Sequence, residues 1–103
     1  MEYTYIRRLL DDAKTELGDL FSLGLSQGER YVDSLTETAR RLNESGLIRG
    51  GELAGRLCES LWRSRIDTAW TAEESFAIYL ELWEYLKKCL FRLDFLEATA
   101  STP

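Results

Sequence analysis

The chain has 103 residues, of which 45% are hydrophobic and 30% are charged, and its formal net charge at pH 7 is −5. That length suits a single domain, and the apolar fraction is too high for a disordered chain. The negative charge disfavours nucleic acid and anionic membranes as partners, because like charges repel. Proline occurs once, at the last residue, Pro103, so nothing before it prevents long helices. An all-α fold is therefore predicted.

The first predicted helix covers residues 3–23. Its apolar side chains alternate spacings of four and three, which places them on one face of a helix. They are Ile6, Leu10, Ala13, Leu17 and Leu20. Gly24 then favours a helix end. Asp11, Asp12, Glu16 and Asp19 are predicted to form a solvated acidic face, partly neutralised by Arg7 and Arg8.

The second predicted helix covers residues 27–43. Ser26 and Glu29 match a capping box, in which the two side chains accept backbone N–H groups at the start of a helix. The apolar face again follows helical spacing: Val32, Leu35, Ala39 and Leu42. The helix is predicted to end near Asn43, where a run of helix-breaking residues leads to Gly46.

The third predicted helix covers residues 51–64. Its apolar face is formed by three leucines: Leu53, Leu57 and Leu61. Gly51 and Gly55 are four residues apart, so they expose backbone on one side of the helix. That pattern favours close approach of another helix, and a weak helix start is the alternative.

The fourth predicted helix covers residues 72–97 and has the most regular pattern. Thr71 and Glu74 match a second capping box. The apolar residues then follow the a and d positions of three heptads: Phe76, Tyr79, Trp83, Leu86, Leu90 and Leu93. Residues 98–103 are predicted to form a disordered C-terminal tail.

Short connections make consecutive helices run in opposite directions. The sequence therefore predicts one domain over residues 1–97, folded as an up-down antiparallel four-helix bundle. The bundle is either complete in one chain or completed by dimerisation through the last helix.

The absence of histidine excludes the Ser-His-Asp and Cys-His mechanisms, histidine-ligated zinc and the Glu-x-x-His pairs of di-iron bundles. The sequence also lacks the glycine-rich phosphate loops and the EF-hand loop. We therefore expect no catalytic residue, no cofactor and no metal, and the chain is not expected to be an enzyme. Neither a signal peptide nor a membrane span is apparent, so a cytoplasmic location is expected.

The remaining reactive side chains have structural interpretations. Cys58 and Cys89 lie far apart on apolar helix faces, which predicts buried free thiols, with a disulfide as the alternative. Glu73 and Glu74 are adjacent, but neighbouring helical residues point about 100° apart, which does not suit a paired acid and base.

The segment 51–66 resembles the first half of a helix-turn-helix, because Leu53, Ala54, Leu57 and Ser60 match its pattern. Cys58 occupies the position of the turn glycine. The resemblance implies a DNA-binding regulator in which Arg63 and Arg65 contact nucleic acid. The other interpretation of this segment is one continuous amphipathic helix.

Residues 17–61 are similar to the helical hairpins of phasin-like proteins. The likeness lies in Leu23-Gly24-Leu25, a capped helix, the break from Arg41 to Gly46, and a second helix. It implies association with polyester storage granules through amphipathic helices.

The apolar surface of the fourth predicted helix is wider than one face of a small bundle needs. Leu82, Cys89 and Leu96 widen the heptad stripe on one side, and Ile78 and Tyr85 widen it on the other. Phe91 and Phe95 lie four residues apart on the side that should face water. The helix is thus buried on all sides, paired with the same helix of a second chain, or docked to another protein.

A homodimer is the first choice, since two-fold self-association is the commonest use of such a surface. The sequence thus predicts a non-catalytic protein–protein interaction or assembly module that binds itself, another protein, or both. The residues expected to form the surface are Phe76, Tyr79, Trp83, Tyr85, Leu86, Leu90, Phe91, Phe95 and Trp70.

Overall fold

The computed structural model describes residues 3–100 and, within them, four α-helices, one 3-10 helix and no strand. The α-helices are α1 (Thr4–Leu23), α2 (Val32–Glu44), α3 (Ile48–Ile66) and α4 (Ala72–Ala100), and the 3-10 helix η1 (Leu25–Tyr31) links α1 to α2. The prediction of an all-α four-helix bundle is confirmed.

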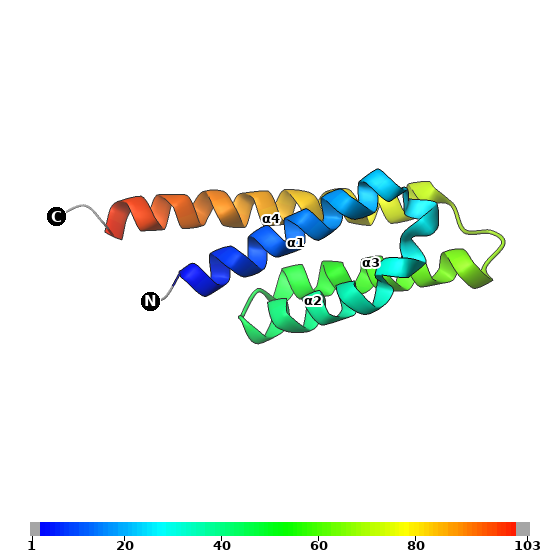
Figure 1. Ribbon diagram of the computed structural model, residues 1–103, viewed down its shortest axis with the longest axis horizontal. Coiled ribbons are helices and arrows are strands. Elements are labelled where there is room, and N and C mark those ends of the chain that lie inside the picture. The colour runs from blue at the N-terminus through cyan, green and yellow to red at the C-terminus, as the bar shows by residue number, and fades with distance from the viewer. Residues whose placement is uncertain (1–2, 101–103) are drawn as a thin grey trace.

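The helices form two antiparallel pairs (Figure 1). Helices α2 and α3 form a tight hairpin, while α1 lies along α4, and α3 packs on α4 to join the pairs. The molecule is elongated, with extents of 58 × 21 × 18 Å. In Figure 1 the first turns of α1 and the last turns of α4 project past the loop between α2 and α3.

The core consists mostly of leucines from all four helices, which confirms the stripes predicted from helical spacing. The fully buried large residues are Leu9, Leu10, Leu17, Leu20, Leu35, Leu42, Leu53, Leu57, Leu61, Leu82 and Leu86. Burying such a side chain contributes about 1.5–3 kcal/mol, so this seam accounts for most of the favourable packing.

The start of the second helix differs from the prediction. Residues 25–31 form a 3-10 helix, and neither η1 nor α2 has a side-chain cap, so the capping-box prediction at Ser26 is wrong. The reason is a close approach to α3: a Cβ on Gly28 would lie 2.4 Å from Cδ2 of Leu61. Glu29 instead forms an ion pair with Arg65 of α3, at 3.6 Å.

Helix α3 begins at Ile48, three residues earlier than predicted, and includes the glycines near its start. A Cβ on Gly50 would lie 2.7 Å from Cε2 of Tyr85, and one on Gly51 would lie 2.1 Å from Oδ1 of Asn43. Gly55 has nothing within 4 Å. The predicted close approach is therefore confirmed at Gly51 and wrong at Gly55, and its main site is Gly50 against α4.

Asp11, Asp12 and Asp19 are exposed as predicted, but the predictions for Arg7 and Glu16 are wrong. Arg7 does not neutralise the acidic face of its own helix; it contacts Asp94 at 2.6 Å and Glu97 at 3.2 Å on α4. Glu16 is half-buried and accepts hydrogen bonds from Ser34 and from Thr38, the latter at 2.8 Å. Arg7 and Glu16 thus bind α1 to neighbouring helices rather than facing water.

The end of α4 also differs from the prediction. Residues 98–100, expected to belong to the tail, continue the helix, while residues 101–103 lie outside the described residues. The single-domain boundary at residue 97 stays a prediction.

The glycines of α3 yield a matched pair of variants. Gly50→Ala should lower the free energy of unfolding by about 1–3 kcal/mol, because the added methyl group overpacks against Tyr85. Gly55→Ala should raise it by about 0.5–1 kcal/mol, because alanine favours a helix and the site is open. Urea unfolding measures both, and equal effects would contradict the close packing of α3 on α4.

Burial raises the pKa of the Glu16 carboxyl above its ordinary value, despite the opposing hydrogen bond from Thr38. Because the raised folded-state pKa favours the protonated form, the Glu16 contribution to stability is largest in acid and decreases as pH rises through that pKa. Glu16→Gln keeps an oxygen acceptor and removes the charge. The free energy of unfolding of this variant, minus that of the parent chain, should therefore increase between pH 4 and pH 7, as measured by urea titrations of both proteins. If the difference between the two proteins did not change with pH, the Glu16 carboxylate would not be desolvated in the folded chain.

Candidate interaction surface

Helix α4 lies between α1 and α3, and this position explains most of its broad apolar surface. Tyr79 is buried and donates a hydrogen bond from its hydroxyl to the backbone carbonyl of Leu17, at 2.8 Å. Leu86 is fully buried. The prediction that Tyr79 and Leu86 form an interaction surface is therefore wrong, because both belong to the core of a single chain.

An aromatic row fills the contact between α1 and α4. Phe21 of α1 lies 6.2 Å from Phe76 and 5.7 Å from Tyr79, measured between ring centroids. Tyr79 stacks on Trp83 at 6.2 Å, and Nζ of Lys14 lies 5.0 Å from the centroid of Trp83. Phe76 and Trp83 thus mainly support the fold, although Phe76 remains 38% exposed.

The other expected interface residues near α3 are also used within the chain. Tyr85 is half-buried against Gly50, and Leu90 is half-buried against the core. The indole N–H of Trp70 donates to the hydroxyl of Ser75, at 3.1 Å. Ser75 in turn shares a buried hydrogen bond with Ser60 of α3, at 2.6 Å.

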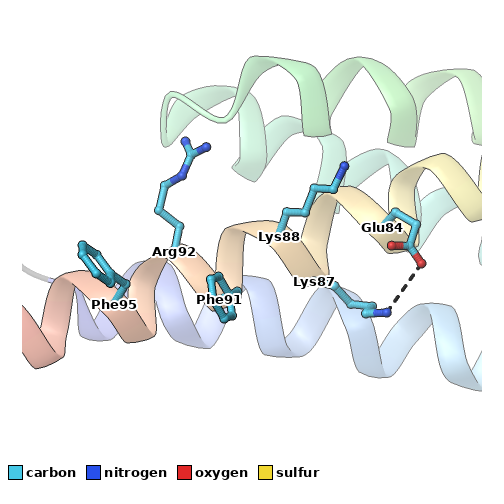
Figure 2. Close-up of a pocket in the computed structure, with 6 residues that line it drawn as sticks. All are labelled: Glu84, Lys87, Lys88, Phe91, Arg92 and Phe95. Atoms are coloured by element: carbon cyan, nitrogen blue, oxygen red, sulfur yellow. Dashed lines mark ion pairs between the residues drawn. The ribbon is translucent and has the colours of Figure 1, made fainter.

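Phe91 and Phe95 differ from these residues, because their side chains are 76% and 65% exposed. They lie on the side of α4 that faces away from α1 and α3, where the sequence placed them. They line a shallow hollow of about 510 Å³, which we call the aromatic hollow (Figure 2). Its lining residues are Glu84, Lys87, Lys88, Phe91, Arg92 and Phe95.

The aromatic hollow is positively charged, although the chain as a whole is acidic. Lys87 lies 3.5 Å from Glu84, whereas Lys88 and Arg92 have no carboxylate partner within residues 3–100. In Figure 2, Lys88 and Arg92 extend toward the α2–α3 hairpin. The exposed rings beside Lys88 and Arg92 favour binding to a partner surface that carries both apolar groups and negative charge.

A second hollow, of about 380 Å³, lies next to the first along α4, and we call it the leucine hollow. Arg49, Leu53, Leu80, Glu81, Glu84, Tyr85 and Lys88 line it. Leu80 is 43% exposed, and Glu81 forms an ion pair with Arg49 at 3.1 Å. Glu84 and Lys88 line both hollows, so the two are continuous along the outward face of α4, and Arg49 and Leu53 of α3 border the second.

Sequence patterns did not identify Arg92 or Leu80 as part of this face. Helical spacing offered a signal, because Arg92 lies four residues after Lys88 and Leu80 lies four residues before Glu84. Their exposure, however, depends on where α1 and α3 pack.

The helix-turn-helix prediction is wrong, because α3 is continuous from Ile48–Ile66 and has no turn near Cys58. Arg63 contacts Asp67 at 3.0 Å and also Glu74. Arg65 pairs with Glu29 and lies 5.6 Å from the ring of Trp62. Both arginines therefore serve contacts within the chain.

Both cysteines are free thiols, with Cys58 buried and Cys89 half-buried. Burial raises the pKa of the Cys58 thiol, which disfavours the nucleophilic thiolate. Its Sγ lies 3.7 Å from the Val32 carbonyl oxygen, so it fills the contact between α2 and α3.

Within residues 3–100, no group of three or more acidic or cysteine side chains is placed to hold a metal ion. None of the helices there combines the length and apolar character needed to cross a membrane. No protein-family model, curated protein or solved structure matches the chain. The phasin-like resemblance stays a prediction.

The Ser60–Ser75–Trp70 network yields a test of how the α3–α4 loop is fixed. Ser75→Ala should lower the free energy of unfolding by about 1–3 kcal/mol, because it removes the partner of a buried hydroxyl and of an indole N–H. Ser22→Ala, at an exposed site on α1, is the control and should change it by less than about 0.5 kcal/mol. Chemical unfolding of the two variants checks this, and equal values would contradict the network.

Proposed function

We propose that this chain is a non-catalytic protein–protein interaction module that self-associates through the outward face of α4. The observation that carries the proposal is the pair Phe91 and Phe95, one helical turn apart and 76% and 65% exposed. Burial of apolar surface is favourable by about 25 cal/mol per Å², so two exposed rings supply a strong tendency to associate.

Two further properties support this function. The residues of the aromatic hollow come from α4 alone, so a partner can cover them without rearranging the bundle. The side chains that resemble catalytic groups have structural roles instead: Cys58 is buried between helices, and Glu74 binds Arg63. Self-association is favoured over other partners because closed two-fold dimers are the commonest soluble assemblies.

The double variant Phe91→Ser/Phe95→Ser tests the proposal. Light scattering at tens of micromolar should give the parent chain a mass near twice 11.9 kDa, and the double variant a mass near 11.9 kDa. Circular dichroism of the variant should remain nearly unchanged, because neither ring belongs to the core. Ile66→Ser is the matched control: Ile66 is 68% exposed at the end of α3, and its loss should leave the dimer intact.

Two results would contradict the proposal. A monomeric parent chain at these concentrations would rule out self-association. Loss of helicity in the double variant would instead show that the two rings stabilise the single chain.

A further inference from the structure

The outward face of α4 has a definite order of residues along the helix. Ala77 and Leu80 are exposed in its first half, and Phe91 and Phe95 are exposed in its second half. Glu84 and Lys88 lie between them and line both hollows. Small and aliphatic side chains thus occupy one end, aromatic rings the other, and opposite charges the middle.

A parallel pair of α4 helices matches this order poorly. In a parallel pair, each residue faces the same residue of the other copy. Glu84 would then face a second Glu84, and Lys88 a second Lys88. Two layers of like charge would lie beside the aromatic rings, and like charges placed opposite each other are unfavourable.

An antiparallel pair with full overlap matches the order well. Helix α4 runs from Ala72–Ala100, so its midpoint is residue 86, and full antiparallel overlap pairs residues at equal distances from that midpoint. Phe95 then faces Ala77, and Phe91 faces Glu81 beside Leu80. The aromatic hollow of each copy lies against the leucine hollow of the other.

Charge supports the same register. Glu84 and Lys88 are equally distant from residue 86, so each faces the other across the two-fold axis, and two such pairs form. Lys88 has no carboxylate partner in the described part of the single chain, and this arrangement supplies one. Lys87 approaches its own counterpart but remains beside Glu84 of its own chain, at 3.5 Å.

A register in which one helix slides past the other by two heptads fits less well. Centring the pair on residue 93 would place Phe91 against Phe95. It would also place Lys88 opposite Ala98, so Lys88 would gain no carboxylate partner, while Leu80 in both copies would stay uncovered. The fully overlapped register pairs Glu84 with Lys88 and also covers the exposed apolar residues of both halves.

Resting on the proposed function, we infer that the partner of α4 is a second copy of this chain whose α4 runs antiparallel and overlaps it fully. Glu84 and Lys88 pair across the two-fold axis, and each aromatic hollow covers a leucine hollow.

The distance between two copies of one labelled site tests this geometry. Thr99→Cys carries a nitroxide label on the flank of the face, with Cys58→Ala and Cys89→Ser removing the other thiols. Pulsed electron paramagnetic resonance should find the two labels about 39 Å apart, from 26 residues of axial offset at about 1.5 Å per residue. A parallel pair places them about 10 Å apart, and the register centred on residue 93 about 18 Å apart.

Charge reversal in the chain with its native cysteines provides a second measurement. Glu84→Lys or Lys88→Glu alone should raise the dissociation constant of the dimer about tenfold, since each change creates two like-charge contacts. The double variant Glu84→Lys/Lys88→Glu should return it to within about threefold of the parent value. In a parallel pair, each reversal only exchanges one like-charge contact for another, so the single variants would leave the dissociation constant near the parent value.

The outcomes separate the two proposals. A monomeric parent chain overturns both. A dimer with labels much closer than 39 Å, with single reversals that leave the dissociation constant unchanged, or without restoration in the double variant, overturns the antiparallel register but leaves self-association through Phe91 and Phe95 intact.

Discussion

Unequal helix lengths are the constraint on which the other features depend. Helix α4 has 29 residues, whereas α1 has 20, α2 has 13 and α3 has 19. At about 1.5 Å per residue, α4 is about 44 Å long, and its shorter neighbours cannot enclose all of it. The leucine seam buries the side of α4 that faces α1 and α3. Within residues 3–100, no element covers the apolar residues on its other side.

Specific contacts keep the projecting end of α4 in place without covering it. Arg7 bonds both Asp94 and Glu97, which are one turn apart on α4, and so fixes α1 along the same end. At the opposite end, the Ser60–Ser75 hydrogen bond fixes α4 against α3. Because α4 is held at both ends, its outward face is a straight, preformed surface. A preformed surface loses less conformational entropy on binding than one that must fold.

The sequence predicted the helices and the core well, because amphipathic spacing depends only on neighbours along the chain. It failed where a tertiary contact decides the outcome. The capping pattern at Ser26 is not used: residues 25–31 form a 3-10 helix in which Gly28 packs closely against Leu61. Tyr79 and Leu86 were assigned to an interface because a heptad stripe identifies a buried face but not the helix that buries it. Phe91 and Phe95 were placed correctly on the outward side, since they lie off the stripe.

The polar groups inside the chain are occupied by structural contacts, which explains why the surface rather than a pocket carries the functional argument. Within residues 3–100, every buried side-chain nitrogen or oxygen has a hydrogen-bond partner. Glu16, which most resembles a functional carboxylate because burial raises its pKa, uses both of its oxygens to bind Ser34 and Thr38. A group bound in this way must break existing contacts before it can act on a substrate. The rings of Phe91 and Phe95 need break no such contact, because a partner only has to displace water from them.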